Sequence, residues 1–144
     1  MDAPQGARHG IDEAVTWRTY VTAVKRRRAG DTLGYGGAYI LPHDADIATI
    51  GVGYGDGLQS ALCAVHAPVL VNGRECPLLA CCMDQAFADV TGAGCHVGDS
   101  VTIFGYDEGG RLLASQAQAL LIGGDEGCGL TAALSPRVAR VYGE

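Results

Sequence analysis

Two tyrosines set among glycines are the residues of this chain best suited to do chemistry. Tyr35 lies in Gly-Tyr-Gly-Gly at residues 34–37, and Tyr54 lies in Gly-Val-Gly-Tyr-Gly-Asp-Gly at residues 51–57. Glycine on both sides of a bulky phenol permits close backbone approach and positive φ, which a tyrosine placed for core packing rarely requires. The setting suits a phenol presented to a ligand or partner, although a turn tyrosine packing its ring at a strand end is the commoner alternative on these residues alone.

A phenol can remove or return a proton only when its surroundings help it. Its free pKa is about 10, so a tyrosine base must be activated by nearby positive charge or by hydrogen bonds. The chain has a single lysine, Lys25, within the basic run Val-Lys-Arg-Arg-Arg at residues 24–28. That run could be a local anion or partner site, but a solvated strand end before the turn at residues 29–31 is the favoured interpretation.

Other catalytic or metal-binding patterns are weak in this sequence. The four histidines are scattered without ligand spacing. His43, together with Asp44 and Asp46, could contact a metal, but a solvated loop is the stronger interpretation, so we predict no metal site. No Ser-His-Asp arrangement is suggested, and no Gly-Lys-Ser/Thr follows the glycine pairs to make a phosphate loop.

The six cysteines lack the paired CxxC spacing of a zinc site. No signal-peptide pattern and no long apolar run accompanies them. We therefore expect a cytoplasmic protein whose thiols are reduced and act as small buried hydrophobes, with a disulfide framework as the weaker alternative. The cysteines are Cys63, Cys76, Cys81, Cys82, Cys95 and Cys128.

Composition excludes several classes of function. A chain of 144 residues fits one domain with a real core, and 22 glycines with 18% charged residues favour many turns and short strands over disorder. The net charge is −6, with a pI near 5.0, so no sequence-wide positive field attracts nucleic acid or an anionic membrane.

The elements that must position the tyrosines are mostly short strands. Asn72-Gly73 between two apolar runs is the strongest hairpin signal, because this pair readily takes the positive φ values of a type I′ turn. We predict a mainly β domain over residues 14–144, barrel-like or a sandwich of seven or eight short strands with one or two short helices, after a flexible leader at 1–13. The expected strands include 15–24, 47–53, 68–71, 74–82, 87–91, 100–104 and 137–142, and the expected helices are 115–122 and 130–134.

These motifs together resemble the C-terminal domain of alanine racemases, pyridoxal-phosphate enzymes that interconvert L- and D-alanine. The family includes the serine/alanine racemases of vancomycin resistance. The likeness covers about residues 14–142 and keeps the family order of motifs. The matching segments are Val-Lys at 24–25, Ala-Gly-Asp-Thr-Leu-Gly-Tyr-Gly at 29–36, Gly-Tyr-Gly-Asp-Gly at 53–57, Val-Leu-Val-Asn-Gly at 69–73, Met-Asp-Gln at 83–85, Val-Thr at 90–91, Val-Gly-Asp-Ser-Val at 97–101 and Arg-Val-Ala-Arg-Val-Tyr at 137–142.

The resemblance implies roles for individual residues. Tyr35 matches the tyrosine that serves as one of two acid/base residues, acting on the cofactor of the opposite subunit in a head-to-tail dimer. Tyr54 matches a tyrosine at the entrance of the substrate channel. Met83 matches the residue whose backbone helps seat the substrate carboxylate, with Asp84 beside it. Cys128 takes the place of a tyrosine or asparagine that shapes the pocket around the cofactor phosphate and substrate.

The resemblance also implies what this chain needs from elsewhere. The family's cofactor-binding barrel and its cofactor-holding lysine have no counterpart here, because Lys25 falls where relatives carry an ordinary strand lysine. We therefore expect no pyridoxal phosphate and no activity in the chain alone. The expected partners are a pyridoxal-phosphate-binding barrel, a second copy of the chain and a small amino-acid substrate. The alternative is a non-catalytic interaction or dimerisation domain, a relic of a racemase.

Overall fold

The computed structural model describes residues 13–124 and 128–143. The expected leader therefore lies almost wholly outside the described residues, and so does the side chain of Cys128. Within the described part, seven strands form one antiparallel sheet, and a separate two-stranded hairpin projects from it. The large sheet contains β1 (Trp17–Arg27), β4 (Ala45–Ile50), β5 (Pro68–Val71), β6 (Arg74–Cys81), β7 (Ala86–Asp89), β8 (Ser100–Tyr106) and β9 (Leu112–Leu113).

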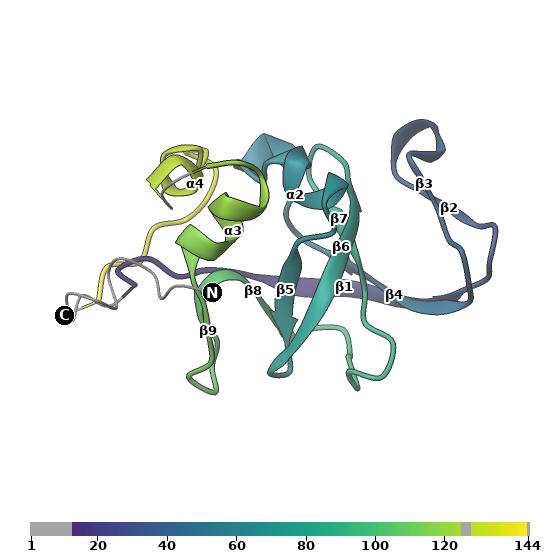
Figure 1. The fold of residues 1–144 in the computed structure, drawn as a ribbon. Coiled ribbons are helices and arrows are strands. Elements are labelled where there is room, and N and C mark those ends of the chain that lie inside the picture. The colour runs from purple at the N-terminus through teal and green to yellow at the C-terminus, as the bar shows by residue number, and fades with distance from the viewer. Residues whose placement is uncertain (1–12, 125–127, 144) are drawn as a thin grey trace.

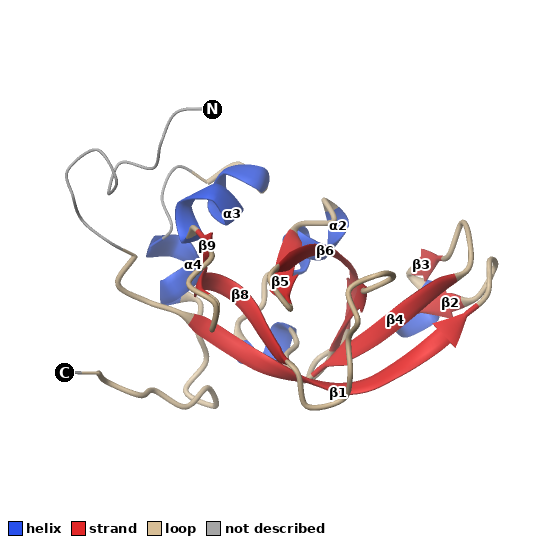
Figure 2. Ribbon diagram, turned by 90° about the horizontal axis from the view of Figure 1, so that it is seen from below, coloured by secondary structure: helices blue, strands red, loops and turns tan. Residues whose placement is uncertain are grey.

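Strand β1 organises the sheet because it pairs with two different neighbours along its length. Its second half pairs with β4, and its first half pairs with β8. The order β1-β4-β7-β6-β5-β8 therefore returns to β1, and the sheet curls into the barrel-like form of Figure 2. A β-bulge between Val21 and Ala23 marks the change of partner, and bulges supply the bend that such closure needs.

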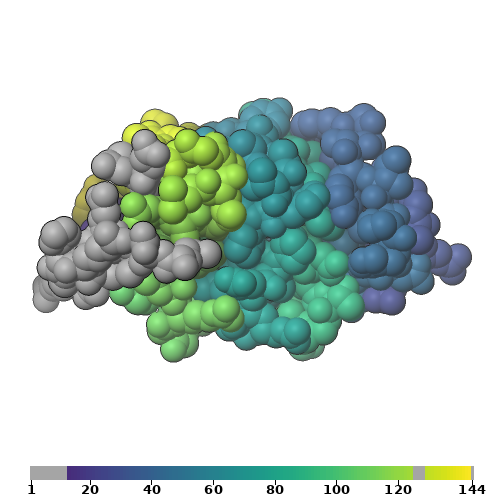
Figure 3. Space-filling model, viewed as in Figure 1, coloured from purple at the N-terminus to yellow at the C-terminus, as the bar shows by residue number. Residues whose placement is uncertain are grey.

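Most of the remaining elements lie at the two ends of this barrel-like sheet. The hairpin of β2 (Thr32–Leu33) and β3 (Tyr39–Ile40), which carries the short 3-10 helix η1 (Tyr35–Gly37), is at one end in Figure 1. Helices α3 (Ser115–Leu121) and α4 (Cys128–Ala132) are at the other end, and the space-filling view in Figure 3 shows the same separation. Between them, η2 (Tyr54–Asp56) and α2 (Ser60–Ala64) follow β4.

Two apolar clusters hold the elements together. The main one fills the inside of the curled sheet, where Trp17 of β1 contacts Phe104 of β8 with ring centroids 5.8 Å apart. A smaller cluster joins the hairpin to the sheet through Leu33, Leu79 and Ala80. The hairpin that bears Tyr35 is therefore anchored by apolar packing at its base.

Most of the elements expected from the sequence are confirmed. The mainly β fold is correct, and the Asn72-Gly73 turn joins β5 to β6 with both residues at positive φ. The terminal strand expected at 137–142 is wrong, because that segment pairs with no strand in the described part of the chain. The Arg140 guanidinium instead donates to the carbonyl groups of Leu134, Ser135 and Val138, which folds the segment into a compact turn. No helix in the described part of the chain is long and apolar enough to cross a membrane.

A buried glutamine attaches α3 to the sheet. Gln118 is fully buried, and its Nε2 donates to the carbonyl oxygens of Pro68 in β5 and Ile103 in β8, at 2.6 and 3.0 Å. Its Oε1 has no partner among the described residues. The amide nitrogen thus links α3 to two neighbouring strands through their backbone carbonyl groups.

Replacing Gln118 with alanine is expected to lower the free energy of unfolding by about 2–4 kcal/mol, since it leaves a cavity and removes the hydrogen bonds to both carbonyl groups. Urea titration followed by circular dichroism measures this change. The matched control is Leu120→Ala on the same helix, because Leu120 is exposed and its loss should change stability by about 0.5 kcal/mol or less. Equal effects of the two substitutions would contradict the role of Gln118.

Candidate functional site

Tyr35 is presented at the tip of the β2–β3 hairpin. Three glycines around it have positive φ, at 80° for Gly34, 63° for Gly36 and 67° for Gly37. These values reverse the chain within η1, and side-chain-bearing residues rarely adopt them. Tyr35 is 64% exposed, and its hydroxyl makes no hydrogen bond to any residue in the described part of the chain. The phenol is therefore directed away from this chain's own core.

The base of the hairpin is fixed by Asp31. Its Oδ2 accepts from the backbone amide of Arg28 at 3.0 Å and from Nε of Arg27 at 3.2 Å. The Arg28 amide and the Arg27 side chain hold the pKa of the Asp31 carboxyl below its ordinary value of 3.8. Backbone bonds from Gly30 to Leu41 and from Leu41 to Asp31 close the hairpin beside this carboxylate.

Tyr54 lies in a loop whose backbone is paired with the end of β6. The amide of Tyr54 donates to the carbonyl of Cys82, and the amide of Gly55 donates to the carbonyl of Met83, at 3.1 and 2.8 Å. A Cβ added to Gly53 would lie 2.5 Å from the Met83 carbonyl oxygen, so only glycine allows this approach. The tyrosine and methionine side chains are 50% and 49% exposed, and this pairing brings the two residues together at the surface.

Asp56 fixes the backbone of the Tyr54 loop. Its Oδ2 accepts from the amide of Gly53 at 2.9 Å, and its Oδ1 lies 3.5 Å from Nε of Arg137. Its carbonyl accepts from the amide of Ser135. The Asp56 side chain is only 15% exposed, whereas that of Arg137 is 51% exposed. The C-terminal segment is thereby attached to the loop that carries Tyr54.

The site residues expected from the sequence are exposed, but the sequence did not identify the residues that hold them in place. Met83 and Asp84 lie in the exposed turn after β6. Asp31 and Asp56 were not singled out, although each lies beside glycine in a turn, where aspartate commonly accepts backbone hydrogen bonds. No local signal identifies Arg137, whose partner lies far away in the sequence. The side chain of Cys128 lies outside the described residues.

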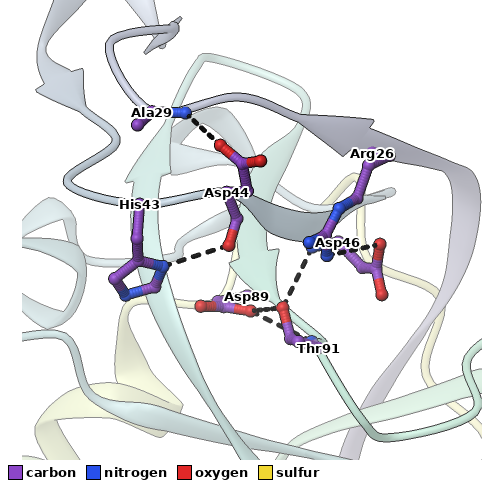
Figure 4. A network of polar contacts seen from close by, with 7 residues as sticks. All are labelled: Arg26, Ala29, His43, Asp44, Asp46, Asp89 and Thr91. Carbon is purple, nitrogen blue, oxygen red and sulfur yellow. Dashed lines mark hydrogen bonds and ion pairs between the residues drawn. The ribbon is translucent and has the colours of Figure 1, made fainter.

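The histidine and aspartates considered as metal ligands form a structural network instead (Figure 4). Asp44 accepts from the amide of Ala29 at 2.9 Å, and Asp46 forms an ion pair with Arg26 at 3.2 Å. His43 Nδ1 lies 3.1 Å from the Asp44 carbonyl. Within residues 13–124 and 128–143, no three His, Cys, Asp or Glu side chains lie close enough together to hold a metal ion.

The basic run of β1 is largely engaged in the same region. Arg26 is paired with Asp46, and Arg27 contacts both Asp31 and the carbonyl of Thr32. Lys25 is exposed on the strand, opposite Ile47 of β4. The arrangement agrees with a solvated strand end, and the lysine lies in no enclosed pocket.

Comparison with known proteins identifies the family. The model of the alanine racemase C-terminal domain matches residues 14–142. The chain belongs to the alanine racemase family. An alanine racemase of Cutibacterium acnes is 36% identical over 141 residues, which cover 96% of this chain and 37% of that relative. The chain thus spans little more than a third of that relative's length.

Solved structures of alanine racemases agree with the fold of this domain. The biosynthetic alanine racemase of Pseudomonas aeruginosa superposes with a TM-score of 0.84 at 27% identity, covering all of this chain and 39% of that one. The alanine racemase of a D-cycloserine-producing Streptomyces lavendulae gives a TM-score of 0.85 at 26% identity, covering 99% and 38%. The alanine racemase C-terminal domain expected from the sequence is confirmed.

We expect the β2–β3 hairpin to lose stability in acid, when the Asp31 carboxylate is protonated. The pKa of Asp31 in the folded state lies below the ordinary value of 3.8, so the unfolded state binds more protons in this pH range. The carboxylate therefore stabilises the fold fully above pH 3.8, and this stabilisation is lost as the pH falls through the folded-state pKa. Protection factors of the Gly30 and Leu41 amides in NMR hydrogen exchange should therefore decrease as the pH is lowered below 3.8. Asp31→Asn should abolish the dependence, and Asp84→Asn should preserve it. A hairpin with the same pH dependence in Asp31→Asn would refute the prediction.

Removing the Asp56 carboxylate should loosen the Tyr54 loop. Asp56→Ala leaves the Gly53 amide without its acceptor, with an expected loss of about 1–2 kcal/mol in the free energy of unfolding and faster amide exchange at Gly53. Asp56→Asn is the matched control, since its amide oxygen still accepts from Gly53 although the attraction to Arg137 is lost. We expect Asp56→Asn to lie between wild type and Asp56→Ala, and equal losses would show that the hydrogen bond contributes nothing.

Proposed function

We propose that this domain donates Tyr35 as an acid/base group for the interconversion of L- and D-alanine. In this proposal the amino acid and pyridoxal phosphate are held by a separate cofactor-binding barrel, and the domain is inactive alone. The observation that carries the proposal is the exposed phenol of Tyr35, which a glycine-rich turn presents away from the core of a racemase-family domain.

The described residues fit the role of proton-transfer partner better than that of cofactor holder. The one lysine, Lys25, is exposed on β1 and faces no enclosed site. The Tyr35 hydroxyl has no partner within the described part of the chain, so positive charge or a hydrogen bond that activates it has to come from the surface on which it docks. The proposal therefore requires a partner that supplies both the cofactor and the activating group.

Each residue of the site has a separate task in this proposal. Tyr35 accepts the α-proton at its phenolic oxygen, or returns it, on one face of the substrate. Tyr54 and the backbone of Met83 border the path of the amino acid and seat its carboxylate. A hydrogen bond from the Gly55 amide to the Met83 carbonyl holds the two segments together. Bound pyridoxal phosphate supplies the electron sink that stabilises negative charge on the α-carbon.

The test is reconstitution with the barrel of a relative. The N-terminal part of the Cutibacterium acnes alanine racemase, without its C-terminal domain, is mixed with this chain, and conversion of L- to D-alanine is followed. We expect activity that depends on both components. Tyr35→Phe should lower the rate by about 10²–10⁴-fold, because it removes a general acid/base group while it keeps the ring.

Two controls separate the catalytic role from folding and docking. Tyr20→Phe should leave the rate unchanged, because Tyr20 is equally exposed, at 61%, but lies on β1 away from the hairpin. If the two parts fail to associate, a chimera in which residues 14–142 replace the relative's own C-terminal domain gives the same readout. Binding to the barrel without activity in either format would favour the non-catalytic interaction domain and contradict the proposal.

A further inference from the structure

Two cysteines that have no task in proton transfer lie on packed elements that adjoin the Tyr54 loop. Cys63 is buried in α2, and Cys81 is the half-buried last residue of β6. Helix α2 packs on β6, and Cys81 packs against the apolar cluster that contains Cys63. Next to burial, each thiol perturbs the pKa of the other. All five cysteines whose side chains are described are free thiols.

A β-bulge in β6 brings Cys81 to this position. Cys76 and Leu78 contact the main apolar cluster, and strict alternation would place Ala80 there as well and turn Cys81 away. The register shift between Leu78 and Ala80 reverses the alternation. Ala80 joins the hairpin cluster, whereas Cys81 packs against the main cluster that contains Cys63. The pair thus depends on a defined feature of the strand.

We propose that Cys63 and Cys81 are a redox-active dithiol that closes to a disulfide and fixes the Tyr54 loop against the end of β6. The positions of the two residues support this consequence. Helix α2 follows the Tyr54 loop directly, and Cys81 directly precedes Cys82, whose carbonyl accepts from the Tyr54 amide. The crosslink would therefore join the two segments whose backbones already pair at the candidate site.

The oxidant in this proposal is a small-molecule disulfide. The Cys81 thiolate, the more accessible of the two, attacks one sulfur, forms a mixed disulfide and releases one small thiolate. The Cys63 thiolate then attacks the Cys81 sulfur and releases the second small thiolate, and the two protons leave the protein thiols for the released thiolates. Two protein thiols are oxidised and one small disulfide is reduced to two thiols. Burial raises the pKa of both cysteines, so the exchange is slow at neutral pH and speeds up with alkali.

The first experiment maps the bond. The reduced chain is incubated with hydroxyethyl disulfide, and free thiols and crosslinked peptides are measured. We expect two of the six thiols to be lost as a Cys63–Cys81 link. Cys81→Ala should prevent the link, Cys63→Ala should stop the reaction at a mixed disulfide on Cys81, and Cys76→Ala in the same strand should leave the link unchanged. Because Cys81 is only half-buried, its variant decides the question even if the Cys63 variant does not fold.

The second experiment tests the effect on the loop. Oxidation should slow amide exchange at Tyr54 and Gly55 about tenfold or more, dithiothreitol should restore it, and Tm should rise by about 5–10 °C. A link between Cys81 and Cys82 or between Cys76 and Cys95 would overturn the proposal, as would unchanged exchange at the loop in the linked protein. Neither readout requires racemase activity, so failure of the disulfide proposal can be distinguished from failure of the proposed function.

Discussion

The pairing of β1 with both β4 and β8 is the constraint on which this structure depends. A strand with two partners in succession converts an open sheet into a closed ring, and the inside of that ring is the main core. The tyrosine hairpin follows one end of β1, and the bulge at Val21 lies where its partners change. If the pairing with β8 were lost, the sheet would open along a row of unpaired backbone groups, a state that aggregates readily.

A second constraint acts on the candidate site, where backbone segments approach each other closely because glycine has no side chain. Gly53 passes against Met83, and Gly57, at φ 107°, passes against Ala133. These contacts place the Tyr54 loop between β6 and the C-terminal segment. The tyrosine ring itself adds little to the core. The loop is therefore positioned by its glycines and by Asp56, and the phenol is left free to meet another molecule.

The sequence predicted local features well and long-range ones poorly. The Asn72-Gly73 hairpin and helix α3 were correct because each is written in a few adjacent residues. The ring closure was not predictable in detail, since alternation in β1 does not say which strand pairs with which half. The contact of Asp56 with Arg137 was missed for the same reason. The mistaken C-terminal strand shows how β-branched and aromatic residues can be overruled when Arg140 takes up the local carbonyl groups.

The contact between Trp17 and Phe104 gives the chain a built-in optical reporter. Trp17 is the only tryptophan, it is buried, and it lies at the seam where β1 meets β8. Its emission will follow opening of that seam and hence loss of the whole core. The Tyr35 hairpin is at the opposite end of β1, so its detachment leaves the indole surroundings unchanged. Comparing tryptophan emission with a signal from the hairpin therefore distinguishes loosening of the site from unfolding of the domain.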